Sequence, residues 1–313
     1  MKITKKNSIK YIGNIITILA IFFVFKQLLA NGLNYQSIFK SKNILPIVIV
    51  VIVQAIIVVT NTYPWKNIVE ILSNKKMPYG DTISIYVKSN LMKYVPGNVF
   101  QYVGRNELAL KQNISHVKVA TATLLDVMMT VLSAFFISLF FLYDYIWRFI
   151  VHYVNGWVII LLAISFFIIC YLAFLFFKEK ILTFLSNNQS IFKKKNMFIL
   201  IKCFLYYVIV MLISSLMYML VFTFILDQHV STTLFLKLFS AYTLSWLVGF
   251  ITPGAPAGIG IKEAVMVGVT GGLVDQSMIA LSMIILRILA TLSDVLAFLV
   301  VGILSKKRKM VSK

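Results

Sequence analysis

Residues 44–63 read ILPIVIVVIVQAIIVVTNTY, twenty positions without one charged side chain. An α-helix rises about 1.5 Å per residue, so a helix of this length crosses the roughly 30 Å hydrocarbon core of a bilayer. In water such a helix would expose apolar side chains on every face, whereas lipid accommodates them. The sequence therefore predicts that this segment spans a membrane.

The rest of the chain repeats this pattern. Of the 313 residues, 60% are hydrophobic and 13% charged, whereas a soluble domain is about 45–50% apolar and about 25% charged. So much apolar surface cannot be hidden in one water-soluble core of this size. We expect a single all-α domain over residues 1–313, a polytopic membrane helix bundle with about six full spans. The predicted spans are 11–30, 44–63, 119–142, 157–177, 197–226 and 276–304.

Basic residues outnumber acidic ones, with 30 Lys and Arg against 10 Asp and Glu. A basic excess can indicate nucleic-acid binding, but here the bases gather between apolar segments, where they orient a membrane protein and contact anionic lipid headgroups. The basic connections are 1–10, 64–118, 178–196 and 305–313. The intervening connections are poor in Lys and Arg, which predicts that both termini are cytoplasmic. We expect a protein of the cytoplasmic (inner) cell membrane whose partners are membrane lipids and not nucleic acid.

Two moderately apolar stretches, 80–110 and 233–274, are interrupted by proline and glycine. These residues end helices, and irregular backbone at membrane depth is tolerated only when it is buried in protein or lines a wet cavity. We therefore expect two re-entrant helical hairpins, the first entering from the inside and the second from the outside. The residues assigned to the hairpin breaks are Pro96, Gly97, Pro253, Gly254, Gly258 and Gly260.

The two breaks share an order of residue types. In each, Pro-Gly is followed by a glycine, a basic residue and an acidic residue. Opposed broken helices in an inverted repeat are a common transporter design, so the order indicates either such a repeat or a coincidence between short motifs. The first set is Gly104, Arg105 and Glu107, and the second is Gly260, Lys262 and Glu263.

The first break offers a phosphate site. A helix beginning near Asn98 would direct unpaired N–H groups and the positive end of its dipole into the protein, where an anion is favoured. The planar fork of an arginine suits phosphate. The alternatives are a broken interfacial helix with snorkelling bases and, at the second break, a tight packed turn. The residues expected to bind a phosphate headgroup are Lys93, Asn98, Arg105, Lys262 and Arg287.

Acidic residues in these apolar segments form a second candidate set. Charges inside a membrane are rare and usually face a cavity or each other. Arg287 and Asp294 are seven positions apart on one helical face, so a structural ion pair is an alternative, and Glu107 is a candidate partner for Arg105. The residues expected to balance charge, couple transport to an ion or contact a cationic headgroup are Glu107, Asp126, Glu263 and Asp294.

Motifs for soluble enzymes are absent from the sequence. No Gly-rich loop ends in Gly-Lys-Ser/Thr, which argues against an ATP-driven pump and favours facilitated or ion-coupled transport. His116, His152 and His229 have no second ligand at a metal spacing, so we expect neither a metal nor a cofactor.

Two motifs together carry a family resemblance. The segment KYVPGN at 93–98 with Gly104 and Arg105, and the later PG…GIGIKE within 253–263, resemble the lysylphosphatidylglycerol synthase transmembrane region family, also described as flippase-like. The resemblance covers nearly the whole chain, and Arg287 matches a basic position in the last segment of that family. It implies a multi-spanning flippase-like fold.

The resemblance also sets expectations about activity. In full-length relatives the membrane domain moves aminoacylated phosphatidylglycerol between leaflets, and a separate C-terminal domain transfers the lysyl group. This chain ends at Lys313, soon after its last predicted span, so we expect it to lack that domain. Relatives often carry an acidic-basic pair near the position of Asp126, where this sequence reads Thr-Leu-Leu-Asp-Val without a base.

Three functions follow from these features. The favoured one is a flippase or translocator for an anionic, aminoacylated or lipid-linked phospholipid. The second is a membrane enzyme, or an enzyme subunit, for phosphatidylglycerol lysyl transfer or envelope-glycan lipid synthesis. The third is a scaffold for a partner such as a glycosyltransferase.

Overall fold

The computed structural model describes residues 40–94, 100–153, 189–252, 260–270 and 273–311, with Gly258 and isolated residues between 157 and 186. Within these residues every regular element is a helix, as predicted for an all-α fold. Several predictions fall outside the described residues. These are span 11–30, most of span 157–177, and Pro96, Gly97, Asn98, Pro253 and Gly254.

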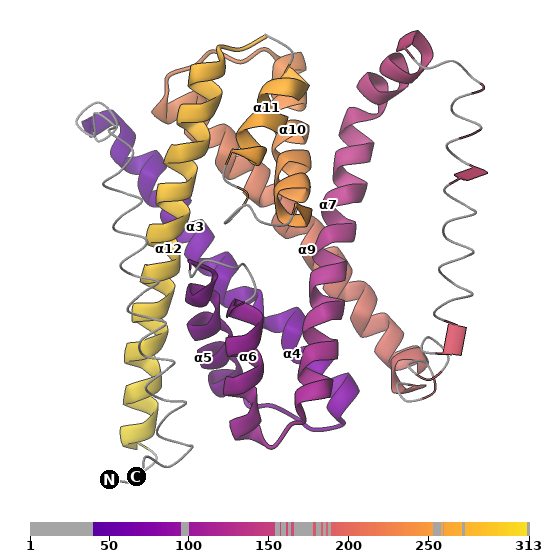
Figure 1. Ribbon diagram of the computed structural model, residues 1–313. Helices are drawn as coiled ribbons and strands as arrows, with labels where there is room; N and C mark the ends of the chain where they lie inside the picture. Colours follow the sequence, from indigo (N-terminus) through magenta and orange to yellow (C-terminus); the bar gives the residue numbers. More distant parts are fainter. Residues whose placement is uncertain are drawn as a thin grey trace, which may run out of the picture.

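Among the described residues, five helical segments are long and apolar enough to cross a bilayer (Figure 1). Four of them overlap the predicted spans 44–63, 119–142, 197–226 and 276–304, so long apolar helices are found at these positions. By length and hydropathy the chain is a multi-pass membrane protein. The five segments are Ser41–Ser73, His116–Phe141, Lys194–Ile225, Thr232–Ile251 and Gln276–Lys306.

These segments and the shorter helices follow one another along the chain. The long helices are α3 (Ile44–Thr60), α7 (His116–Tyr153), α9 (Lys194–Leu220), α10 (Thr232–Ile251) and α12 (Gln276–Val311). The shorter ones are α4 (Thr62–Ser73), α5 (Tyr79–Asn90), α6 (Phe100–Ala109) and α11 (Ile261–Thr270). Single turns add η1 (Ser41–Asn43), η2 (Leu91–Tyr94), η3 (Leu110–Gln112), η4 (Gln189–Phe192) and η5 (Val221–Ile225).

Helix α10 differs from the prediction for this part of the chain. The sequence treated 233–274 as a hairpin, yet its first helix has 20 residues and begins at a cap in which the Ser231 hydroxyl accepts from the N–H of Leu234 at 3.3 Å. Twenty residues extend about 30 Å, the thickness of the hydrocarbon core. The Pro-Gly break comes late enough that the preceding helix reaches the length of a full span, while α11 after it has ten residues.

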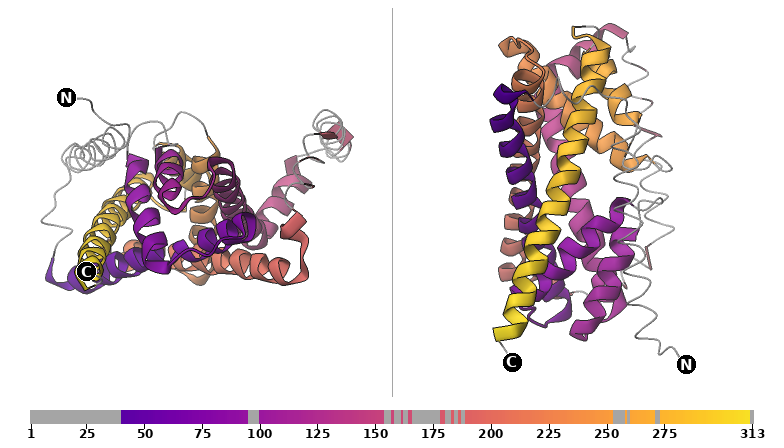
Figure 2. Two further views of the ribbon diagram at one scale, coloured as in Figure 1. Left: turned by 90° about the horizontal axis from the view of Figure 1, so that it is seen from below. Right: turned by 90° about the vertical axis from the view of Figure 1, so that its left-hand side faces the viewer.

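Two pairs of helices that follow each other along the chain lie at opposite ends of the bundle (Figures 1 and 2). Helix α5 packs against α6, and α10 packs against α11. Helix α12 runs the height of the bundle and contacts α3, α5 and α11. Both pairs are therefore anchored to the same long helix.

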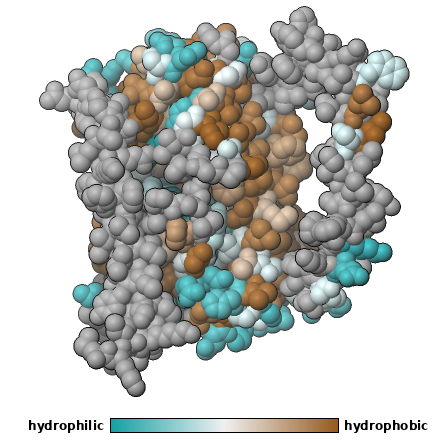
Figure 3. All heavy atoms as spheres, viewed as in Figure 1, coloured by the Kyte–Doolittle hydropathy of each residue, from teal (hydrophilic) through white to brown (hydrophobic). Residues whose placement is uncertain are grey.

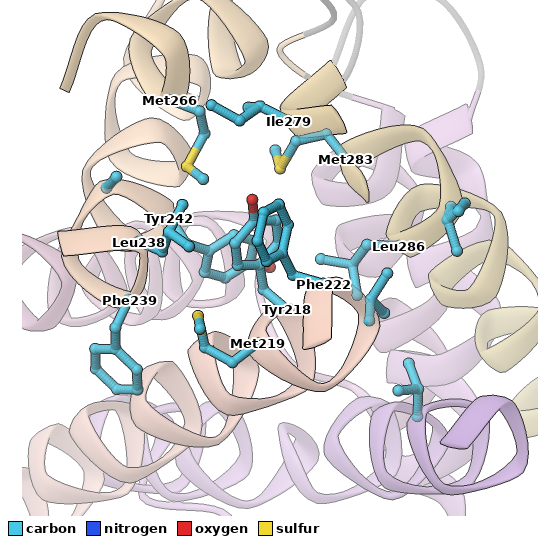
Figure 4. Packing of buried hydrophobic residues seen from close by; sticks show 14 of the residues in the cluster. Tyr218, Met219, Phe222, Leu238, Phe239, Tyr242, Met266, Ile279, Met283 and Leu286 are labelled. Atoms are coloured by element: carbon cyan, nitrogen blue, oxygen red, sulfur yellow. The ribbon is translucent and has the colours of Figure 1, made fainter. Parts of the chain in front are cut away.

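Two large apolar cores hold the bundle together, and a smaller third cluster joins α3, α5 and α12. One large core joins α9, α10, α11 and α12 (Figure 4), and at its centre Tyr218 stacks on Tyr242 with ring centroids 5.1 Å apart. The other large core packs Trp65 of α4 against α5, α6 and α7. Along α7, Ala122 belongs to the core around Trp65, and Ala134 belongs to the core around Tyr218. The polar positions of α7 between these two residues therefore lie in a layer between the cores.

The outer surface is apolar where a bilayer would contact it. Large apolar side chains of α7, including Phe136 and Phe140, are exposed. On the face in Figure 3, hydrophobic residues dominate the middle and hydrophilic ones gather toward the two ends. This distribution suits a protein whose middle part lies in the hydrocarbon core of a bilayer and whose two ends reach water.

One glycine sets how closely α6 approaches the turn before it. A Cβ at Gly104 would overlap Sδ of the buried Met92, whereas a Cβ at Gly268 of α11 would meet no atom within 4 Å. We expect Gly104→Ala to destabilise the protein by about 1–3 kcal/mol through overpacking, partly offset by the better helix propensity of alanine. The matched change Gly268→Ala carries only the favourable term. Thermal unfolding in detergent compares them, and equal midpoints would contradict the close packing.

Candidate functional site

Two adjoining cavities, of about 310 and 520 Å³, lie between the apolar cores. We refer to them together as the central cavity. They share eight lining residues, which come from α5, η2, α7, α9, α10, α11 and the junction of α3 and α4, so they form one continuous region. The shared residues are Asn61, Asn90, Lys93, Tyr94, Thr130, Tyr207, Trp246 and Lys262.

Residues on both sides of each sequence break line this cavity. Tyr94 and Gln101 flank the first break, and Phe250 and Lys262 flank the second. The two helix pairs therefore approach the central cavity from opposite ends of the bundle (Figure 1). Positions that the sequence places about 150 residues apart line a single site.

Asp294 of α12 receives three donors from the end of the first pair. Lys93 Nζ lies 2.7 Å from one carboxylate oxygen, to which the Tyr94 hydroxyl also donates. Asn90 Nδ2 donates to the other oxygen at 2.7 Å. The carboxylate is buried, and these bonds replace the water it has lost. They join α5 and η2 to α12.

Arg105 and Asp126 form a second, fully buried ion pair. The Arg105 Nη1 atom lies 3.3 Å from Asp126 Oδ2, and the Tyr207 hydroxyl donates to the other carboxylate oxygen. The guanidinium also lies 3.8 Å from the centre of the Tyr86 ring, a cation–π contact. Both charges are thus compensated inside the protein, and the pair joins α6 to α7.

A third ion pair joins α11 to α12. Arg287 Nη2 lies 3.1 Å from Glu263 Oε1, while the Gly260 N–H donates to Oε2 at 2.8 Å. The second contact is the backward half of a capping box, in which an acidic residue in the first turn satisfies the N–H before the helix. Gly258 and Gly260 have φ of +71° and +81°, a backbone region that glycine enters without steric cost.

Among the described residues, Lys262 is the basic side chain of this site that forms no ion pair. Its stem crosses two glycines, since a Cβ at Gly249 would lie 2.6 Å from Lys262 Cγ and one at Gly258 would lie 2.9 Å from Cε. It lines both parts of the central cavity. Within the residues that the structure describes, it forms no ion pair and no hydrogen bond.

The site thus has one more positive than negative charge. Three of its bases are paired with three carboxylates, and Lys262 is left over. Lys262 is close enough to Arg287, Glu263 and Lys93 to interact electrostatically with all three, although Glu263 makes its ion pair with Arg287. The paired groups are Lys93 with Asp294, Arg105 with Asp126, and Arg287 with Glu263.

The pairing differs from what the sequence suggested. Arg105 contacts Asp126 and not Glu107, which lies outside the cavity lining. Arg105 also supplies the base that the sequence around Asp126 lacks. Arg287 and Asp294 share a helical face, but each pairs with a residue from another helix. Their binding roles stay predictions.

Several lining residues were not predicted. Asn90, Tyr207 and Trp246 look like ordinary members of apolar segments, because tyrosine and tryptophan are frequent in membrane proteins. Only the neighbourhood of a charge distinguishes them, and that depends on the packing of distant helices. Among the described residues, no cluster of three His, Cys, Asp or Glu side chains offers a metal site.

Comparison of the chain with protein-family models, with curated proteins and with solved structures finds no match. The function must therefore be argued from the central cavity itself.

Proposed function

We propose that the chain is a lipid translocator of the cytoplasmic membrane. It moves an anionic, phosphate-bearing headgroup from one leaflet to the other through the central cavity of the protein. The observation that carries the proposal is Lys262, a basic side chain in a cavity between apolar helices that forms no ion pair with any described carboxylate, since the nearby Glu263 is paired with Arg287. An unpaired charge in such surroundings is costly. An anionic headgroup would supply the missing counter-charge.

In this proposal, the α5–α6 pair and the α10–α11 pair act as re-entrant hairpins. A ten-residue helix such as α6 or α11 extends about 15 Å, half of the hydrocarbon core. In the proposal, the pairs enter from opposite faces, with both termini in the cytoplasm, and hold the headgroup between them. Because the break in the α10–α11 pair comes late, α10 reaches farther than α5, the first helix of the other pair.

The ion pairs are consistent with an inverted repeat. In the first unit, the base Arg105 of α6 pairs with an acid of the following long helix α7. In the second unit, the acid Glu263 of α11 pairs with a base of the following long helix α12. The same structural relation recurs with the charges exchanged, as expected for opposed units around one transport site.

The paired carboxylates suggest how a headgroup would pass. A phosphate can compete with Asp294 for Lys93 and with Glu263 for Arg287, because it offers the same kind of acceptor oxygen. Each exchange would loosen one helix pair from α12. The proposed translocation is therefore facilitated or ion-coupled, with rearranging ion pairs as its moving contacts.

Reconstitution into vesicles tests the proposal. Lipids with a fluorescent acyl chain and different headgroups, including phosphatidylglycerol and its lysylated form, are placed in both leaflets, and a membrane-impermeant quencher reports those that reach the outer leaflet. Vesicles with the protein should lose the protected fraction of an anionic lipid much faster than protein-free vesicles. Equal rates in the two preparations for every headgroup would refute translocation.

A further inference from the structure

The central cavity contains enough detail to define the headgroup more closely. We infer that it selects a net-negative phosphodiester carrying neutral hydroxyl groups, and that it disfavours a net-cationic aminoacylated headgroup. This inference rests on the proposed translocation function, because it names the substrate class of that same cavity. Three features carry it: the charge balance, the occupation of the carboxylates and a set of unpaired neutral polar groups.

The charge balance favours one added negative charge. Lys262 has the cations Lys93 and Arg287 and the carboxylate of Glu263 near it, but Glu263 is already paired with Arg287, so Lys262 has no ion-pair partner of its own. A phosphodiester monoanion would neutralise this surplus. A lysylated phosphatidylglycerol headgroup has two ammonium groups for one phosphate, so it would bring an additional positive charge into the cavity.

The carboxylates are already occupied. Asp294 accepts from Lys93, Tyr94 and Asn90, and both of its oxygens are used. Asp126 is bound by an arginine and a tyrosine, and Glu263 by an arginine and a backbone N–H. An incoming ammonium would have to displace a cation that already belongs to the protein.

Neutral polar groups, in contrast, are free. Gln54 of α3, Ser214 of α9 and Trp246 of α10 line the smaller part of the cavity together with Lys262 and Arg287. In the described part of the chain, none of these three side chains has a hydrogen-bond partner. An amide and a hydroxyl can both donate to and accept from sugar or glycerol hydroxyls, and an indole N–H can donate to them.

The size of the cavity suits a headgroup. Its parts, of about 310 and 520 Å³, fall within the range of roughly 300–1,000 Å³ typical of small-molecule sites. The phosphate is expected beside Lys262 and Arg287, and the hydroxylated group toward Gln54 and Ser214. The acyl chains stay outside, in lipid.

The test uses the full-length chain in vesicles and labelled lipids that differ only in headgroup: phosphatidylglycerol, phosphatidylinositol, phosphatidic acid, a neutral diglucosyl lipid and lysylated phosphatidylglycerol. The two hydroxylated anions should move fastest. The neutral and lysylated lipids should move at least about tenfold more slowly than the hydroxylated anions, which is the effect of losing one charge-assisted contact. Phosphatidic acid, which keeps the phosphate but lacks the hydroxyls, should fall between them.

Variants separate the two parts of the headgroup. Gln54→Leu and Ser214→Ala should each lower the ratio of phosphatidylglycerol to phosphatidic acid movement. Gln228→Leu, the same change at a glutamine outside the cavity whose amide donates to the Leu226 carbonyl, should leave that ratio as it is in the wild type. Equal ratios in Gln54→Leu, Ser214→Ala and the wild type would overturn the assignment of the hydroxyl subsite.

The outcomes for the two proposals are distinguishable. Lysylated phosphatidylglycerol moving as fast as phosphatidylglycerol overturns the headgroup inference and leaves translocation intact. Absence of movement for every lipid overturns the proposed function. Labelled glycerol phosphate provides the water-soluble counterpart, and its entry into vesicles that move no lipid would assign the same chemistry to a soluble phosphate ester and refute lipid translocation.

Discussion

Asp126→Asn is expected to destabilise the protein by about 3–5 kcal/mol, because it leaves a buried arginine without its counter-charge. Arg105 and Asp126 are each 3% exposed, so water cannot compensate the loss. The amide can still accept a hydrogen bond from Tyr207, but it cannot neutralise the guanidinium. Thermal unfolding in detergent, followed by tryptophan fluorescence, measures the change.

A double variant identifies the cause. Arg105→Met combined with Asp126→Leu removes both charges and fills their volume with apolar atoms, which often restores stability when a buried ion pair is replaced. We expect the double variant to recover most of the loss caused by Asp126→Asn alone. If it unfolds as easily as the single variant, the unpaired arginine is not what destabilises the protein.

The exposed ion pair of Lys42 with Asp227 provides the matched control. The Lys42 ammonium, 2.6 Å from the carboxylate, holds the pKa of Asp227 below its usual value. The stabilisation is therefore present above the unfolded-state pKa and is lost as the pH falls through the lower folded-state value. Solvent screens this pair, so its stabilisation is small and Asp227→Asn is expected to leave the unfolding midpoint at neutral pH close to that of the wild type.

The spans could be predicted because length and hydropathy decide them locally. The segment 44–63 needs no partner to be recognised as membrane-spanning, and the structure places α3 there. Helix α10 shows the limit of this reasoning. A Pro-Gly motif marks where a helix ends, but whether the preceding helix spans the bilayer depends on where that helix begins, which Ser231 determines through its cap.

The ion pairs could not be predicted, because they join distant parts of the chain. Lys93 and Asp294 are about 200 residues apart, and Arg105 and Asp126 lie on different helices. The spacing of Arg287 and Asp294 correctly places both on one face of α12, but spacing along a helix does not reveal what another helix brings to that face. The sequence shows that charged residues inside apolar segments are unusual, but the packing of the helices determines which of them pair.

Lys262→Gln is expected to slow translocation of an anionic lipid by about 10-fold or more, since one charge-assisted contact is worth roughly 1.5–3 kcal/mol. Glutamine retains a polar tip but loses the charge. Because Lys262 has no partner in the described protein, its removal leaves no buried carboxylate unpaired. The unfolding midpoint should therefore stay close to that of the wild type, in contrast to Asp126→Asn.

Three companion variants make this expectation specific. Lys262→Glu should abolish movement of anionic lipids, because it places a repelling charge where the phosphate is expected. Lys262→Arg should retain part of the activity, limited by the narrow space over Gly249 and Gly258. Lys202→Gln, at an exposed lysine of α9 whose ammonium lies over the ring of Phe198, should have no effect. Wild-type rates in Lys262→Gln and Lys262→Glu, with the proteins folded, would remove Lys262 from the transport site, because a charge that binds the passing headgroup cannot be neutralised or reversed without changing its rate.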